Sequence, residues 1–123
     1  MNAYIKSAAL TSPLSSSVAA LEKRARAALA LADLYPSELE VSKTPQASAL
    51  VVSFVSKLSN EIVLVLVSYE TPAAFFYSGA ATGFAVENGF YSRTTDKSTR
   101  LFADGRHLVR LAATDFLKLL HNA

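Results

Sequence analysis

The residues best suited to catalysis in this chain are its two histidines, because it contains no cysteine. Without cysteine there can be no disulfide, thiolate zinc site or cysteine nucleophile. His107 lies near Asp104 and Arg106, but a metal site there would need further carboxylates from distant parts of the chain. His121 lies close to the last residue, where fraying is expected. We therefore expect both histidines to face solvent, and we expect neither an enzyme nor a bound metal or cofactor.

Glycine and serine patterns give no stronger indication of catalysis. Gly79 and Gly83 superficially resemble a phosphate-binding loop, but the Gly-Lys-Ser/Thr that must follow is missing. The chain also lacks the Gly-x-Ser-x-Gly sequence that forms the nucleophile elbow of hydrolases. The two glycines are therefore expected in a connection between strands.

Residues suited to binding are better represented. The predicted partner-binding residues are Tyr91, Arg93, Lys97, Arg100, Arg106 and Arg110. Basic side chains next to an aromatic one can hold phosphates and stack bases. The formal net charge of the whole chain is only +2, however, so binding to nucleic acid would be weak at physiological salt. This favours a protein partner for the same surface, with the aromatic side chain as an anchor.

A run of branched aliphatic residues at positions 62–67 marks the centre of the expected fold. Such an unbroken run predicts a strand that is buried on both faces. It is too short to cross a bilayer, which takes about 20 apolar residues. Apolar stretches at 50–57 and 73–78 predict a strand on either side of it, and residues 36–48 are expected to form a connection. Asn88-Gly89, between two further apolar stretches, predicts a tight hairpin.

Three segments have helical character. Residues 14–34 are rich in alanine and place their larger apolar residues near one helical face. The polar segment 92–100 predicts a short helix that is capped by Thr94 or Thr95 and that ends or kinks at Asp104-Gly105. Residues 106–120 carry an apolar stripe at helical spacing and predict the C-terminal helix.

Together these elements predict a single α+β domain over residues 1–123, with an N-terminal helix, an antiparallel meander of four to five strands and a C-terminal helix packed on one sheet face. Hydrophobic residues make up 51% of the chain and charged residues 18%, which indicates apolar surface that is covered by a partner. The alanine-rich helix allows close approach of a second copy, so a homodimer is one expected assembly. The N-terminus lacks the pattern of a secretory signal, so we expect a cytoplasmic protein without membrane contact.

Two motifs carry a resemblance to a known family. Residues 68–74 read S-Y-E-T-P-A-A and residues 91–95 read Y-S-R-T-T. They resemble a family of small uncharacterised proteins from bacteriophages and their hosts, in which S-Y-x-T-P-V-A precedes Y-S-x-T-T-S-x-H at the start of a helix. The resemblance spans residues 67–98, with Ala73 in place of valine and Ser98 near the position of histidine. It implies a phage or mobile-element origin and a helix-capping role for the two threonines, but no activity.

Three hypotheses about function follow. The first is a non-enzymatic, phage-encoded protein that binds and inhibits or modulates a host protein or ribonucleoprotein complex in the host cytoplasm, as an anti-CRISPR or other anti-defence protein does. The alternative is an accessory protein that binds nucleic acid through the basic residues between Arg93 and Arg110. A small enzyme that uses His107 is the least supported of the three.

Overall fold

The computed structural model describes residues 15–46, 48–79, 83–89 and 93–123, and within them the side chains of 15–17 and 93–96 are not described. In chain order the elements are α1 (Ser15–Ala30), β1 (Glu40–Lys43), β2 (Ala49–Val55), β3 (Ile62–Ser68), β4 (Thr71–Tyr77), β5 (Phe84–Asn88), α2 (Arg93–Ala103), β6 (His107–Leu111) and α3 (Ala113–His121). The predicted class, α+β with a helix before a mostly antiparallel sheet, is confirmed. No helix in this described part is long and apolar enough to cross a bilayer.

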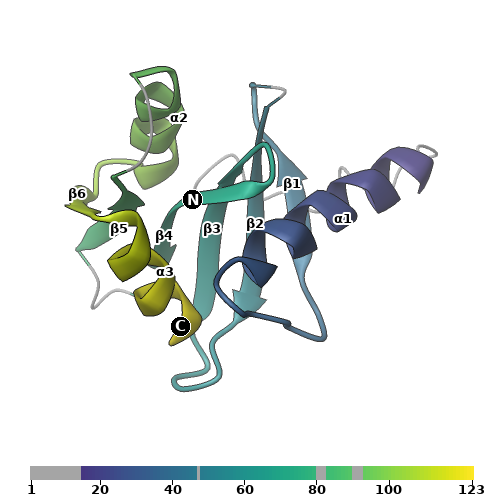
Figure 1. The fold of residues 1–123 in the computed structure, drawn as a ribbon, viewed down its shortest axis with the longest axis horizontal. Helices are drawn as coiled ribbons and strands as arrows, with labels where there is room; N and C mark the ends of the chain where they lie inside the picture. The colour runs from purple at the N-terminus through teal and green to yellow at the C-terminus, as the bar shows by residue number, and fades with distance from the viewer. Residues whose placement is uncertain (1–14, 47, 80–82, 90–92) are drawn as a thin grey trace.

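The strands form a six-stranded sheet whose spatial order follows the chain, from β1 at one edge to β6 at the other (Figure 1). The first five strands pair antiparallel, as a meander does, and the last pair is parallel. A parallel pair needs a crossover connection, and α2 supplies it by carrying the chain from the end of β5 to the start of β6. The sheet is therefore mixed, with one strand more than the predicted meander.

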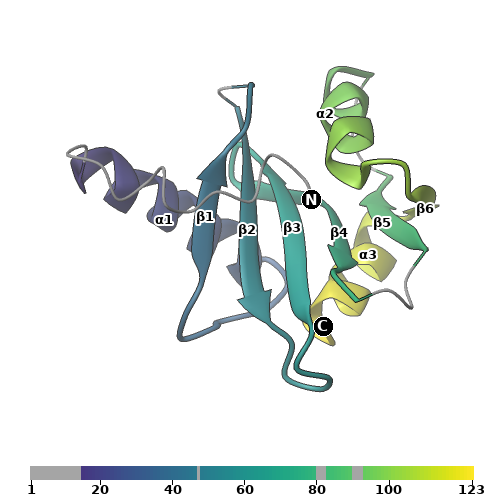
Figure 2. The same cartoon turned by 180° about the vertical axis from the view of Figure 1, so that it is seen from behind.

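Helices cover both faces of the sheet, so the prediction that they lie on one face was wrong. α1 and α3 pack on one face, where Leu29 and Phe116 join one core cluster, while Phe102 of α2 joins a second cluster on the opposite face (Figures 1 and 2). The central strand β3 explains why both faces need covering. Its valines belong to the first cluster and its leucines to the second, because alternate residues of a strand point to opposite faces. The predicted burial of this strand on both faces is confirmed.

The predicted hairpin at Asn88-Gly89 was wrong. β5 already has β4 on one side and β6 on the other, so neither of its edges is open to a returning strand. Instead, the Gly89 amide donates to the Leu111 carbonyl at 2.7 Å, which extends the pairing with β6. The second half of the expected hairpin, residues 90–92, lies outside the described residues.

The helix predicted over residues 106–120 is also divided. Its first part is β6, and only the second part, α3, is helical. Between them Ala112 has an extended backbone, with φ −59° and ψ 150°. Leu108, Val109 and Leu111 are only partly buried, as suits an edge strand, and pairing along the whole of β5 overrides the local helical spacing.

Two smaller differences concern the connections. Residues 36–48 contain the edge strand β1, whose polar composition hid it because an edge strand needs few apolar residues. Thr94 and Thr95 lie inside α2 instead of before it, so the prediction that one of them caps the helix concerns side chains outside the described set. The end of that helix is as expected, since Asp104 and Gly105 both have positive φ.

Candidate protein-binding surface

The predicted partner-binding residues have different surroundings where the structure describes them. Tyr91 and the side chain of Arg93 lie outside the described residues. Lys97 and Arg100 are exposed on the outer side of α2, as a binding role requires. The remaining two arginines contact other parts of the protein.

Arg106 connects α2 to the sheet. Its guanidinium carbon lies 3.9 Å from the centre of the Phe76 ring, a cation–π contact. That ring packs in turn on Phe102 of α2, with 4.8 Å between the ring centres. Nη1 of Arg106 donates to the Ala103 carbonyl at 3.4 Å, a long hydrogen bond. These contacts give Arg106 a structural role where α2 ends.

Arg110 pairs with the neighbouring strand. Its Nε donates to Oε1 of Glu87 at 2.9 Å, and the two residues are direct partners in the register between β6 and β5. The pair places opposite charges on adjacent parallel strands, which favours this register. Of the described members of the predicted cluster, Lys97 and Arg100 are thus the two without an internal contact of this kind.

The two histidines lie in different surroundings. His107 is exposed at the start of β6. His121 is half-buried, with Nδ1 2.9 Å from the Ala32 carbonyl, and so connects the end of α3 to the turn after α1. The expectation that His121 frays into solvent was therefore wrong. Within the described part of the chain, no three His, Cys, Asp or Glu side chains come together as a metal site would require.

A different surface carries the exposed apolar residues. At the end of the sheet where β2 turns into β3, four large side chains face solvent, and we call them the apolar end: Tyr35, Val55, Leu58 and Ile62, which are 72%, 60%, 79% and 46% exposed. Val55 and Ile62 face each other across the two strands. A strand alternates its side chains, so Val55 lies on the sheet face opposite the buried Phe54, and it is exposed there.

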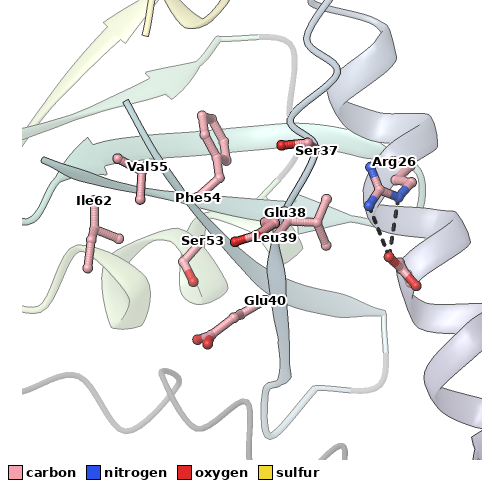
Figure 3. A pocket seen from close by; sticks show the side chains of 10 residues that line it. Arg26, Ser37, Glu38, Leu39, Glu40, Ser53, Phe54, Val55 and Ile62 are labelled. Atoms are coloured by element: carbon pink, nitrogen blue, oxygen red, sulfur yellow. Dashed lines mark hydrogen bonds and ion pairs between the residues drawn. The ribbon is translucent and has the colours of Figure 1, made fainter. Parts of the chain in front are cut away.

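Two hollows, of about 500 and 570 Å³, lie beside the apolar end. They share Ser37, Glu38, Phe54 and Val55. The sheet register explains their position: β1 begins at Glu40 opposite Ser53, so the last two residues of β2 have no partner in β1. Figure 3 shows the first hollow, with Val55 and Ile62 side by side at one end and the Arg26 side chain at the other.

One wall of the first hollow is held by Arg26 of α1. Its guanidinium donates to Oε1 of Glu22 at 3.1 Å (Figure 3). It also donates to the Pro36 carbonyl at 2.9 Å. The pair with Glu22 is exposed and weak by itself. The bond to Pro36 fixes the segment that leads into β1, so Arg26 keeps the entrance of the hollow in place.

The hollows carry an excess of negative charge. Their lining includes four acidic residues and two basic ones: Glu22, Asp33, Glu38 and Glu40 against Arg26 and Lys57. Glu38 and Glu40 are both exposed. This local excess of acid stands out in a chain whose formal net charge is +2.

Sequence reasoning missed this surface because it followed the charge pattern. The available signal was a large apolar residue, Leu58, inside a polar turn that joins two buried strands. The position of Tyr35 beside that turn depends on the path of residues 31–39, which no local pattern indicates.

The comparisons with known proteins give a family without an activity. The sequence model of one family, described as a family of unknown function (DUF8033), matches residues 19–116. That range includes every strand of the sheet, all of α2 and most of α1. No curated protein and no solved structure matches the chain.

Proposed function

The chain belongs to this family of unknown function, and on that premise we propose that it is a non-enzymatic protein-binding module. The observation that carries the proposal is the apolar end, where four large apolar side chains are exposed together beside two hollows. Exposed apolar patches with a polar rim are typical of protein–protein interfaces. Here charged residues of β1, of α1 and of the segment before β1 supply that rim.

The partner in this proposal is a host protein or ribonucleoprotein complex, which the chain binds and inhibits or modulates in the host cytoplasm. The resemblance of residues 67–98 to phage-associated proteins supports this choice, because small phage proteins without catalytic groups often act by covering a surface of a host protein. In this proposal the chain acts as an anti-CRISPR protein or another anti-defence inhibitor does.

The test compares two tyrosines of equal exposure. Tyr35 in the apolar end is 72% exposed, and Tyr69 in the turn between β3 and β4 is 71% exposed. Proteins captured from a host-cell lysate by the unaltered chain are quantified against those captured by Tyr35→Asn, Leu58→Glu and Tyr69→Asn variants. We expect a partner lost with the first two variants and retained with the third, since truncation of an interface anchor costs about 2 kcal/mol or more.

A partner retained by both variants of the apolar end would contradict the proposal. Circular dichroism of each variant controls for folding. All three substitutions are at exposed turn or loop positions, where changes in stability are usually within about 0.5 kcal/mol.

A further inference from the structure

We propose that the hollows beside the apolar end bind the exposed side of α2 from a second copy of this chain. The inference rests on the proposed function in one respect, that the apolar end is a docking surface. It adds the identity of one occupant, which the charge distribution of the chain itself indicates.

The exposed side of α2 carries positive charge, which complements the excess of acidic residues in the hollows. Ser98, Thr99 and Phe102 are buried toward the sheet, and Ser98 also donates a hydrogen bond to the Gln46 side chain. Lys97, Arg100 and Leu101 are left on the solvent side, where Leu101 is 49% exposed. Helical spacing places these three on one stripe, with two cations around an apolar centre.

The hollows offer the complementary arrangement. Val55 and Ile62 supply an apolar wall, and Glu38 and Glu40 supply exposed carboxylates next to it. A leucine side chain set against this wall would bring its neighbouring cations toward those carboxylates. Opposite charges around an apolar contact give orientation and specificity to an interface.

The two surfaces lie at opposite corners of the molecule. Figures 1 and 2 show α2 at one end of the sheet, far from the turn between β2 and β3 and from the chain that leads into β1. One copy therefore cannot fill its own hollow, and the contact joins the α2 of one copy to the hollow of the next. Such a contact between two different surfaces builds open chains or closed rings, or a two-fold dimer in which each copy places its α2 in the hollow of the other.

A charge-exchange experiment tests this contact. One variant, Glu38→Lys with Glu40→Lys, makes the hollow basic, and a second, Lys97→Glu with Arg100→Glu, makes α2 acidic. The mass of the purified full chain is measured by sedimentation velocity and light scattering from about 10 µM to about 500 µM, a range that reveals the weak association expected of a small interface.

We expect the unaltered chain to grow in mass with concentration and each variant alone to remain monomeric. An equimolar mixture of the two variants restores association, because the basic hollow then meets acidic α2 and the acidic hollow meets basic α2. A Glu70→Lys, Asp115→Lys variant changes the net charge by the same amount as the first variant at exposed positions elsewhere, and it should associate like the unaltered chain.

Three results would overturn the inference: a monomer at every concentration, association that persists in both variants, or a mixture that stays monomeric. Each of these leaves the lysate test of Tyr35 and Leu58 unaffected, so failure of the second-copy contact is distinguished from failure of the proposed function. Conversely, self-association with no lysate partner would support the inference and count against a host complex.

Discussion

At the scale of single residues, the type of a side chain indicated less about its role than its neighbours did. Arg106 and Arg110 looked like ligands for a partner because they lie close in sequence to other basic residues. In the structure one stacks on Phe76 and the other pairs with Glu87. A guanidinium satisfies both kinds of contact, through its flat face and through its directed donors, so composition alone does not separate an exposed arginine from a structural one.

Tyr77 gives a prediction at this scale. Burial raises the pKa of its hydroxyl above the usual 10.0, and the nearby carboxylate of Glu61 adds to the effect. Above pH 10 the unfolded chain therefore loses this proton before the folded chain does, so the unfolded state binds fewer protons and the free energy of unfolding falls as the pH rises. We expect urea unfolding between about pH 9 and pH 11 to show a smaller fall for Tyr77→Phe than for the unaltered chain.

The exposed Tyr35 is the control for this measurement. A Tyr35→Phe variant should keep the full pH dependence, because its ring is mostly in water. If the free energy of unfolding fell equally with pH in all three proteins, the shifted pKa of Tyr77 would not contribute to the pH dependence of stability.

At the scale of elements, the largest error in the predictions came from one strand. Residues 106–120 have helical spacing throughout, and α3 follows it, but β6 does not. The five residues of β6 pair with β5 along their whole length, which gives them ladder hydrogen bonds on the side that faces β5. The same pairing closes off the edge of β5 that the predicted hairpin needed.

Gly89 gives a prediction at the scale of this strand pair. A Cβ atom at this position would lie 2.7 Å from the Leu111 carbonyl oxygen, closer than side chains tolerate. We expect Gly89→Ala to lower the free energy of unfolding by about 1–3 kcal/mol, because the end of β6 must shift to make room. Chemical denaturation measures this.

Gly83, which directly precedes β5 as Gly89 directly follows it, is the matched control. A Cβ atom there has no neighbour within 4 Å. Gly83→Ala should therefore be neutral, or stabilising by about 0.4–1 kcal/mol through the lower entropy of the unfolded chain. If Gly83→Ala lowered the free energy of unfolding more than Gly89→Ala does, the close approach of Gly89 to Leu111 would not be what makes a side chain unfavourable at Gly89.

At the scale of the whole molecule, the protein has two surfaces of different character. α2 presents exposed basic residues at one corner, and the acidic hollows with the apolar end lie at another (Figures 1 and 2). The nucleic-acid alternative uses only the first of these, and two of its predicted arginines already have internal contacts. This separation is what makes the protein-binding proposal and the alternative distinguishable.

The alternative predicts binding to short DNA or RNA that weakens steeply with salt. With Lys97 and Arg100 as the exposed described contributors, the slope of log affinity against log salt should reach about −2 on double-stranded DNA, near −0.9 for each phosphate contact. At physiological salt we expect fluorescence anisotropy to detect no binding at protein concentrations up to about 100 µM. Such an affinity is weaker than that of typical non-specific DNA-binding proteins. Micromolar binding that is lost in Lys97→Ala, Arg100→Ala would instead favour the nucleic-acid function.

The sequence by itself determined the parts of this protein whose structure depends on near neighbours. The buried central strand, the two strands beside it, the first helix and the positive-φ end of α2 all follow from residue type and spacing, because burial and backbone preference act locally. Only the tertiary structure decided the rest. The parallel position of β6 and the placing of helices on both faces each bring together residues far apart in the chain, which no local pattern encodes. The same holds for the contact of Arg106 with Phe76, the pair of Arg110 with Glu87 and the position of Tyr35 beside Val55.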